Sequence, residues 1–159
     1  MAAILAQRMA AMIDGDFVVF LIGMRINRWW KVASWGPIVA AMPRMLAELA
    51  AHPELGLLHA RNHFGFPNLM VVQYWRSFEQ LADYAADRTK AHLPAWRAFN
   101  QKVGSNGDVG IWHETYLVRA GAYETLYNNM PRFGLAQAGE AVAATGRLNT
   151  AKGRLGGSE

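Results

Sequence analysis

The chain has 159 residues, of which 52% are hydrophobic and 18% are charged, a composition typical of one folded domain and one that excludes general disorder. It contains no cysteine, which excludes disulfides, thiol nucleophiles and cysteine-bound zinc and agrees with a cytoplasmic location. The formal net charge is +4, but the basic residues are scattered, so we predict no binding of nucleic acid.

The predicted elements begin with a mildly amphipathic segment over residues 1–15, which is expected to form an arm or a short helix. Residues 17–26 are rich in β-branched and aromatic side chains and predict a buried first strand. The apolar run in this strand is too short to span a bilayer, so no membrane span is predicted. A helix is expected over 37–51, and Pro43 is predicted to kink it or shorten its first half.

The elements predicted next are strands over 57–64 and 69–75, a helix over 77–87, a helical piece over 94–104 and a strand over 109–118. Ser77 and Gln80 form a capping box at the start of the first of these helices. The resulting order, β-α-β-β-α-β, is that of a ferredoxin-like α+β fold. Residues 16–138 form this domain in our interpretation, and residues 139–159, which are small and polar, are predicted to be a loose C-terminal tail.

The predicted sheet has an apolar face on each side, although both helices can cover only one of them. An exposed apolar face of that size is not tolerated in a soluble monomer. The simplest cover is a second copy of the chain related by a two-fold axis, so we predict a homodimer.

Two histidines near the last strand are the main candidates for chemistry. His92 shares the apolar stripe of its helical region with Trp96 and is predicted to face the sheet. His113 and Glu114 are neighbours in a strand, so they point to opposite faces and cannot pair within one chain. Two structural interpretations stay open: a core histidine bonded to a backbone carbonyl for His92, and an ion pair between Glu114 and Arg25.

Three further polar residues alternate along the second strand, namely His59, Arg61 and His63. They could bind an anion or a metal, but we favour a solvated face of an edge strand. His52, beside a proline at a helix end, is interpreted as a surface residue. The sequence contains no phosphate-binding glycine loop, nucleophile-elbow serine or recognised metal-ligand spacing.

Several motifs together resemble a known family: Gly23-Met24-Arg25, the run from Val72 to Glu79, His92 with Trp96, the run from Gly110 to Tyr116, and Tyr127-Asn128-Asn129-Met130-Pro131 followed by Gly134-Leu135. Over residues 16–138 the chain resembles the fumagillin-pathway monooxygenase-like family, a domain of unknown function with phenylacetaldoxime dehydratase-like members. This family belongs with the dimeric α+β barrels of the antibiotic-biosynthesis monooxygenase superfamily. The resemblance therefore implies the dimeric α+β barrel fold. It leaves the function open, because the superfamily includes oxygenases, haem proteins, dehydratases and ligand-binding domains.

The leading hypothesis is a small monooxygenase-like enzyme that needs no cofactor and acts on a hydrophobic or aromatic molecule in a pocket between helices and sheet. His113 is predicted to be the catalytic base and His92 an auxiliary group, with Glu114 as the third catalytic candidate. The predicted substrate-binding residues are Arg25, Tyr74, Trp96 and Tyr116.

Two alternatives use the same fold. In the first, the protein binds haem with His92 as the axial ligand, and Arg25, Arg61 or Arg88 meets the propionates. Apart from that role of His92, no metal ligand is predicted. In the second, the protein is a dimeric ligand-binding domain without catalytic activity.

Overall fold

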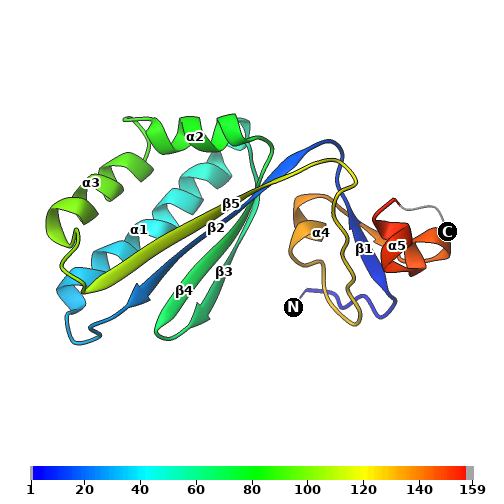
Figure 1. Cartoon of the computed structure of the whole chain (residues 1–159), viewed down its shortest axis with the longest axis horizontal. Helices are drawn as coiled ribbons and strands as arrows, with labels where there is room; N and C mark the ends of the chain where they lie inside the picture. Colours follow the sequence, from blue (N-terminus) through cyan, green and yellow to red (C-terminus); the bar gives the residue numbers. More distant parts are fainter. Residues whose placement is uncertain (1, 157–159) are drawn as a thin grey trace.

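The computed structural model describes residues 2–156 and contains a four-stranded antiparallel sheet with the strand order β3-β4-β2-β5 (Figure 1). Its strands are β2 (Phe17–Ile26), β3 (Leu57–Gly65), β4 (Asn68–Trp75) and β5 (Val109–Val118). The first strand of this sheet in the chain lies between the third and the fourth, which confirms the ferredoxin-like α+β fold.

The helices α1 (Val32–Ala51), α2 (Phe78–Ala86) and α3 (His92–Lys102) lie over one face of the sheet (Figure 1). Helix α1 is longer than predicted, and it continues through Pro43. The prediction of an interruption was wrong because burial of the inner side of α1 against the sheet outweighs the hydrogen bond that a proline removes. Ser77 caps α2 as predicted, since its hydroxyl accepts a hydrogen bond from the backbone N–H of Gln80.

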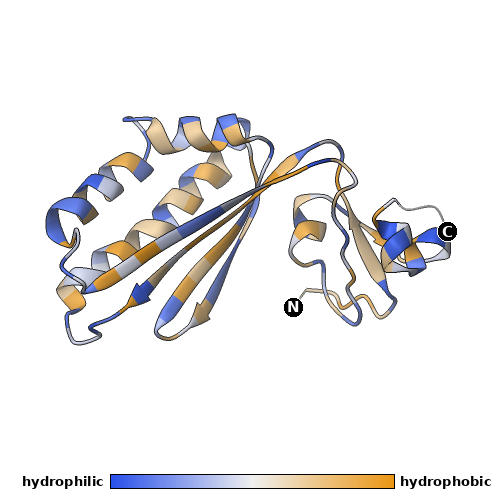
Figure 2. Ribbon diagram, viewed as in Figure 1, coloured by the Kyte–Doolittle hydropathy of each residue, from blue (hydrophilic) through white to orange (hydrophobic). Residues whose placement is uncertain are grey.

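The core between helices and sheet has two parts. At one end the buried residues are Val18, Leu49, Trp75, Leu81 and Tyr84, and at the other end they are Met24, Ile26, Val103 and Val109. Figure 2 shows apolar residues along the strands, whereas the outer helix α3 is mostly hydrophilic. None of the described helices has the length and apolar character that a membrane crossing requires.

The two ends of the chain meet in a second, smaller lobe (Figure 1). Strand β1 (Met9–Met12) pairs antiparallel with β6 (Glu140–Ala143), and α4 (Leu135–Ala138) packs against both strands. Helix α5 (Ala151–Arg154) packs against the 3-10 turn Gly146–Asn149 in the same lobe, and a further 3-10 turn, Pro53–Leu55, follows α1.

The prediction of a loose tail over 139–159, and of an arm or short helix over 1–15, is therefore corrected. Each segment is too short to show a periodic pattern alone, and it becomes ordered because the other segment satisfies its backbone hydrogen bonds. Met1 and residues 157–159 of these predicted segments lie outside the described residues.

The sheet face opposite the helices, here called the open face, is partly covered by this lobe. Leu135 and Ala136 of α4 form an apolar cluster in which Val19, Tyr74 and Val118 of the open face take part. The prediction of a fully uncovered face was wrong in this part because the chain folds back on itself after β5. The remaining open face, around Leu21, Val72 and Trp112, is not covered by the described residues.

Candidate functional site

The structure divides the seven predicted site residues between the two faces of the sheet. Strand register places His113 on the helix side, since it pairs with Ile22 of β2. His92 and Trp96 belong to α3 and lie on that side too. The open face carries Arg25, Tyr74, Glu114 and Tyr116. The two groups cannot converge on one substrate within a single protomer.

His113 lies on the helix side of β5, which is an edge strand, and its side chain is exposed. Its ring centroid is 5.6 Å from that of Phe20 on the adjacent strand. Neither imidazole nitrogen of His113 forms a hydrogen bond to another described residue. An imidazole with this freedom has both ring nitrogens available to a ligand that enters from the edge of the sheet.

His92 is the first residue of α3, and its ring is held in place by the preceding helix. Its Nδ1 lies 3.0 Å from the carbonyl oxygen of Ala85, so Nδ1–H is the donor in the neutral ring. The lone pair of the neutral imidazole is then on Nε2. The ring also packs 6.3 Å from the ring of Tyr84, whose hydroxyl donates a hydrogen bond to Glu48. The interpretation of His92 as a histidine bonded to a backbone carbonyl is therefore correct for Nδ1. Nε2 remains able to accept a hydrogen bond from a ligand or to bind a metal.

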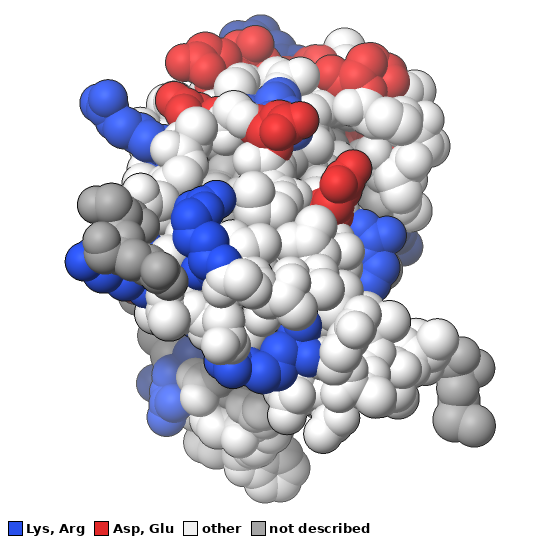
Figure 3. All heavy atoms as spheres, turned by 90° about the vertical axis from the view of Figure 1, so that its right-hand side faces the viewer, with Lys and Arg blue, Asp and Glu red and all other residues white. Residues whose placement is uncertain are grey.

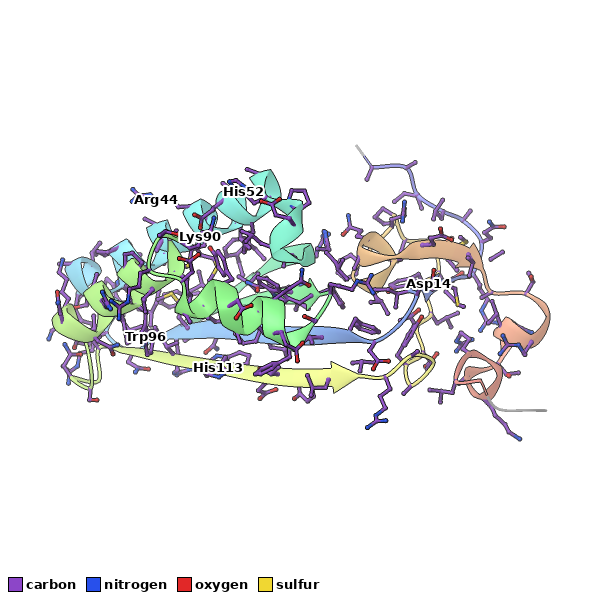
Figure 4. The ribbon with its side chains drawn as sticks, turned by 90° about the horizontal axis from the view of Figure 1, so that it is seen from above. Asp14, Arg44, His52, Lys90, Trp96 and His113 are labelled. Atoms are coloured by element: carbon purple, nitrogen blue, oxygen red, sulfur yellow. The ribbon has the colours of Figure 1, made fainter. Side chains whose placement is uncertain are left out.

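Trp96 lies on α3, the helix next to β5, and Figure 4 shows it with His113 on these two neighbouring elements. Its ring stacks on Phe99 with a centroid distance of 5.5 Å, and Phe99 packs in the same apolar cluster as Ile111 of β5. Trp96 itself is 43% exposed. This edge of the sheet therefore combines the two imidazoles with the apolar rings of Phe20, Trp96 and Phe99 and the hydroxyl of Thr115.

On the open face, Tyr116 donates a hydrogen bond of 2.5 Å to Glu114, and this bond raises the pKa of the Tyr116 hydroxyl. Arg25 instead bonds the side-chain oxygen of Asn68 at 3.3 Å. The expected ion pair between Glu114 and Arg25 is not formed in the described structure. Glu114 and Tyr116 are two residues apart on the same face of β5, so Glu114 pairs with Tyr116 rather than with Arg25.

His59 is a residue whose surroundings the sequence did not reveal. Its Nε2 is buried and has no hydrogen-bond partner among the described residues. Burial lowers the pKa of His59, the nearby Arg61 lowers it further, and the side chain of Gln137 acts in the opposite direction. The imidazole is therefore held neutral against the open face.

The cover over His59 comes from the segment that follows β5. Phe133 packs edge-on against the ring of His63 and lies 4.1 Å beneath the guanidinium of Arg61. The hydroxyl of Tyr74 approaches Gly134 so closely that an added methyl group there would lie 3.3 Å away. Burial raises the pKa of Tyr74, and the adjacent Tyr127 adds to this effect. The prediction of an exposed edge strand is correct for Arg61, which is exposed on β3. It was wrong for His59 and His63, which are half-buried, because the segment that covers them is distant in sequence.

Two shallow hollows of the described structure are large enough to note. One, of about 640 Å³, is lined by residues of the smaller lobe: Ala2, Ala3, Leu5, Met9, Arg132, Gln137, Glu140 and Ala141. The other, of about 420 Å³, is lined by Leu46, Leu49, Ala50, Pro53, Leu57, Leu58, His59 and Ala60, between α1 and β3. Neither includes His92 or His113. Among the described residues, no three His, Cys, Asp or Glu side chains are grouped as metal ligands.

The sheet order and the helical layer define the class of ferredoxin-like α+β proteins. Within it, the chain belongs to the family described as Monooxygenase af470-like, which matches residues 17–135. Monooxygenase af470 from Aspergillus fumigatus is 30% identical over 125 residues, which are 72% of this chain and 43% of that protein. The chain therefore spans less than half of this curated relative.

Solved structures share the fold. An aldoxime dehydratase in complex with butyraldoxime has a TM-score of 0.58 and 17% identity, and the match covers 86% of this chain and 38% of that one. SnoaB from Streptomyces nogalater, a cofactor-independent oxygenase, has a TM-score of 0.47 and 14% identity, covering 65% of this chain and 94% of that one.

Proposed function

We propose that the protein is a monooxygenase that oxidises a hydrophobic or aromatic molecule without a cofactor, and that His113 is the base. Membership of a monooxygenase-like family supports the reaction class. The main support for this site is the position of His113, which lies beside Phe20 on the helix side of the sheet. Neither of its ring nitrogens forms a hydrogen bond to another described residue. A general base has to reach its proton without first breaking a hydrogen bond.

The reaction begins with transfer of a proton from an activated C–H bond of the substrate to His113. The carbanion passes an electron to O2, and the two radicals combine to a peroxide anion. This anion takes back the proton from His113 to become a hydroperoxide, which then loses water. A CH2 group becomes a carbonyl, so that one oxygen atom of O2 enters the product and the other leaves as water. Apolar side chains such as Phe20 and Trp96 would keep water from the carbanion.

His92 is the auxiliary group in this proposal. Because Ala85 fixes its Nδ1 as the donor, Nε2 can accept a hydrogen bond from a substrate hydroxyl. Arg25, Tyr74, Glu114 and Tyr116 lie on the other face, so we assign them a role in substrate binding only through a second copy of the chain.

That second copy is itself part of the proposal. Leu21, Val72 and Trp112 lie on the part of the open face that the smaller lobe does not cover. A homodimer with these faces packed together would bury them. Sedimentation equilibrium at micromolar concentration tests this, and a monomer there would reject the dimer. The absence of cysteine supports the cytoplasm as the location.

Oxygen uptake with anthrone, an aromatic ketone with an acidic CH2 group, tests the activity. Protein purified without haem and treated with a chelator is expected to consume one O2 for each anthraquinone formed. His113→Gln should lower the rate about a hundred- to ten-thousandfold. His52→Gln is the matched control, because His52 is an exposed histidine whose ring pairs with Glu54 at 2.9 Å. An active His113→Gln protein rejects His113 as the base, and anthrone binding without O2 uptake favours the ligand-binding alternative.

Haem binding is a second candidate, and one observation favours it. The bond from Nδ1 of His92 to the carbonyl of Ala85 is the arrangement that orients an axial histidine. Haem would supply redox chemistry at iron. Of the three arginines considered for its propionates, Arg25 and Arg61 lie on the open face, so only Arg88, between α2 and α3, remains. A Soret band from haem-supplemented cells that is lost in His92→Ala would support haem and reject the cofactor-free reaction.

A further inference from the structure

One end of the sheet carries four large aromatic side chains that are exposed to solvent. Trp29 and Trp30, in the loop after β2, are 64% and 61% exposed, and Phe64 and Phe66, at the β3–β4 hairpin, are 78% and 74% exposed. We call these four residues the aromatic end. In Figure 1 both loops lie along the lower edge of the molecule.

The two loops are neighbours and are firmly attached to the sheet. The backbone N–H of Ile26 donates to the carbonyl of Pro67 in the hairpin. The backbone N–H groups of Asn27 and Arg28 both donate to the carbonyl of Asp108, and the indole N–H of Trp35 donates to the carbonyl of Trp29. The aromatic end is therefore held in its exposed position by its own backbone. Exposed apolar patches of this kind mark interaction surfaces.

The same end is strongly basic. The three segments that meet there, 25–31, 63–68 and 102–110, contain four basic residues, namely Arg25, Arg28, Lys31 and Lys102. They contain one acid, Asp108, which is buried and already paired with Arg28 and Lys31. Figure 3, which faces the side of the smaller lobe, shows the acidic residues of that side toward the top of the molecule. The charge at this end therefore complements an anionic surface.

We propose that the aromatic end docks the protein on an anionic lipid bilayer, with Trp29, Trp30, Phe64 and Phe66 inserted at the headgroup level. Tryptophan and phenylalanine are favoured at that depth because their apolar rings can insert at the boundary between headgroups and acyl chains. Basic side chains around them attract anionic headgroups. The aromatic side chains project from two loop tips, which suits shallow insertion into lipid. Docking would let the chain collect a hydrophobic substrate directly from the bilayer, but the inference does not depend on the proposed reaction.

Co-sedimentation of the 159-residue chain with vesicles tests the proposal. We expect binding to vesicles of phosphatidylcholine with 30% phosphatidylglycerol, and at least tenfold weaker binding to pure phosphatidylcholine or in high salt. The double variants Trp29→Ser/Trp30→Ser and Phe64→Ser/Phe66→Ser should each weaken binding to anionic vesicles at least tenfold. Phe78→Ser/Leu117→Ser is the matched control, because these two residues are 47% and 70% exposed at other places and should not affect binding.

Three results would overturn the proposal. The wild-type chain could fail to bind anionic vesicles at millimolar lipid. The aromatic variants could bind as tightly as the wild type while their circular dichroism shows that they are folded. Sedimentation could show that the wild type is an oligomer which the aromatic variants dissociate, with no binding to vesicles, and the aromatic end would then be a contact between copies of the chain.

Discussion

His59→Leu should stabilise the protein at neutral pH, an unusual result for a substitution in a packed region. In the wild type the buried Nε2 of His59 forms no hydrogen bond of normal geometry, although the side chain of Gln137 interacts with the imidazole ring. An unsatisfied buried polar atom costs about 1–3 kcal/mol, and leucine has a similar volume without a polar atom. After allowance for imperfect packing we expect a gain of about 1 kcal/mol, which for a chain of this size raises Tm by roughly 2–4 °C.

The same substitution should change the response to acid. Burial and then Arg61 lower the pKa of His59 below its ordinary value of 6.5, so the unfolded chain takes up the proton first. The wild type should therefore lose stability as the pH falls from 6.5 towards the lowered pKa, and His59→Leu should lack this loss. Thermal denaturation followed by circular dichroism at pH 7.5 and pH 5.5 measures both effects. His52→Leu, at an exposed histidine, is the control and should stay within about 0.5 kcal/mol. If His59→Leu is destabilised at pH 7.5, the imidazole has a partner that the reasoning omits.

Three further substitutions test other parts of the fold. Asp108→Asn should lower Tm at pH 7. Burial raises the pKa of Asp108, but the hydrogen bonds from Lys31, Ser34 and Arg28 lower it by more, so its contribution to stability is present above the ordinary value of 3.8 and is lost as the pH falls through the lowered pKa. The loss of Tm in Asp108→Asn should therefore become smaller as the pH falls below 3.8, and a loss that does not change with pH would contradict this. Removal of residues 139–159 deletes β6 and should lower Tm by more than about 5 °C, and an unchanged Tm would mean that β1 is stable alone. Gly23→Ala places a methyl group 2.5 Å from the ring of Trp112, so the indole should move, with a cost of about 1–3 kcal/mol and a shift in tryptophan emission that Gly107→Ala should not produce.

The fold of the sheet was predictable because its signals are local. The strand that contains Val18 is a dense apolar run, and the cap at Ser77 marks a helix start. Alternation along β5 also predicted that His113 and Glu114 face opposite ways, as the register confirms. The extra length of α1 was missed because a proline inside a helix is a strong local signal that tertiary packing overrides.

The environment of the candidate site was less predictable because it depends on distant contacts. Pairing of β1 with β6 joins segments at the two ends of the chain. His63 packs against Phe133 and His59 lies against Gln137, each at least seventy residues away in the sequence, so no local pattern predicts this cover. Sequence reasoning grouped Tyr74 and His113 in one pocket by residue type, whereas the register separates them by the thickness of the sheet.

The central claim is that His113 removes a proton from carbon without help from a cofactor. Hydrogen–deuterium exchange at the CH2 group of anthrone, followed by NMR in D2O under argon, tests it without involving O2. We predict that haem-free wild type and His52→Gln accelerate the exchange equally and that His113→Gln does not. Exchange that is equally fast with His113→Gln, or O2 uptake by the wild type without accelerated exchange, would contradict the account.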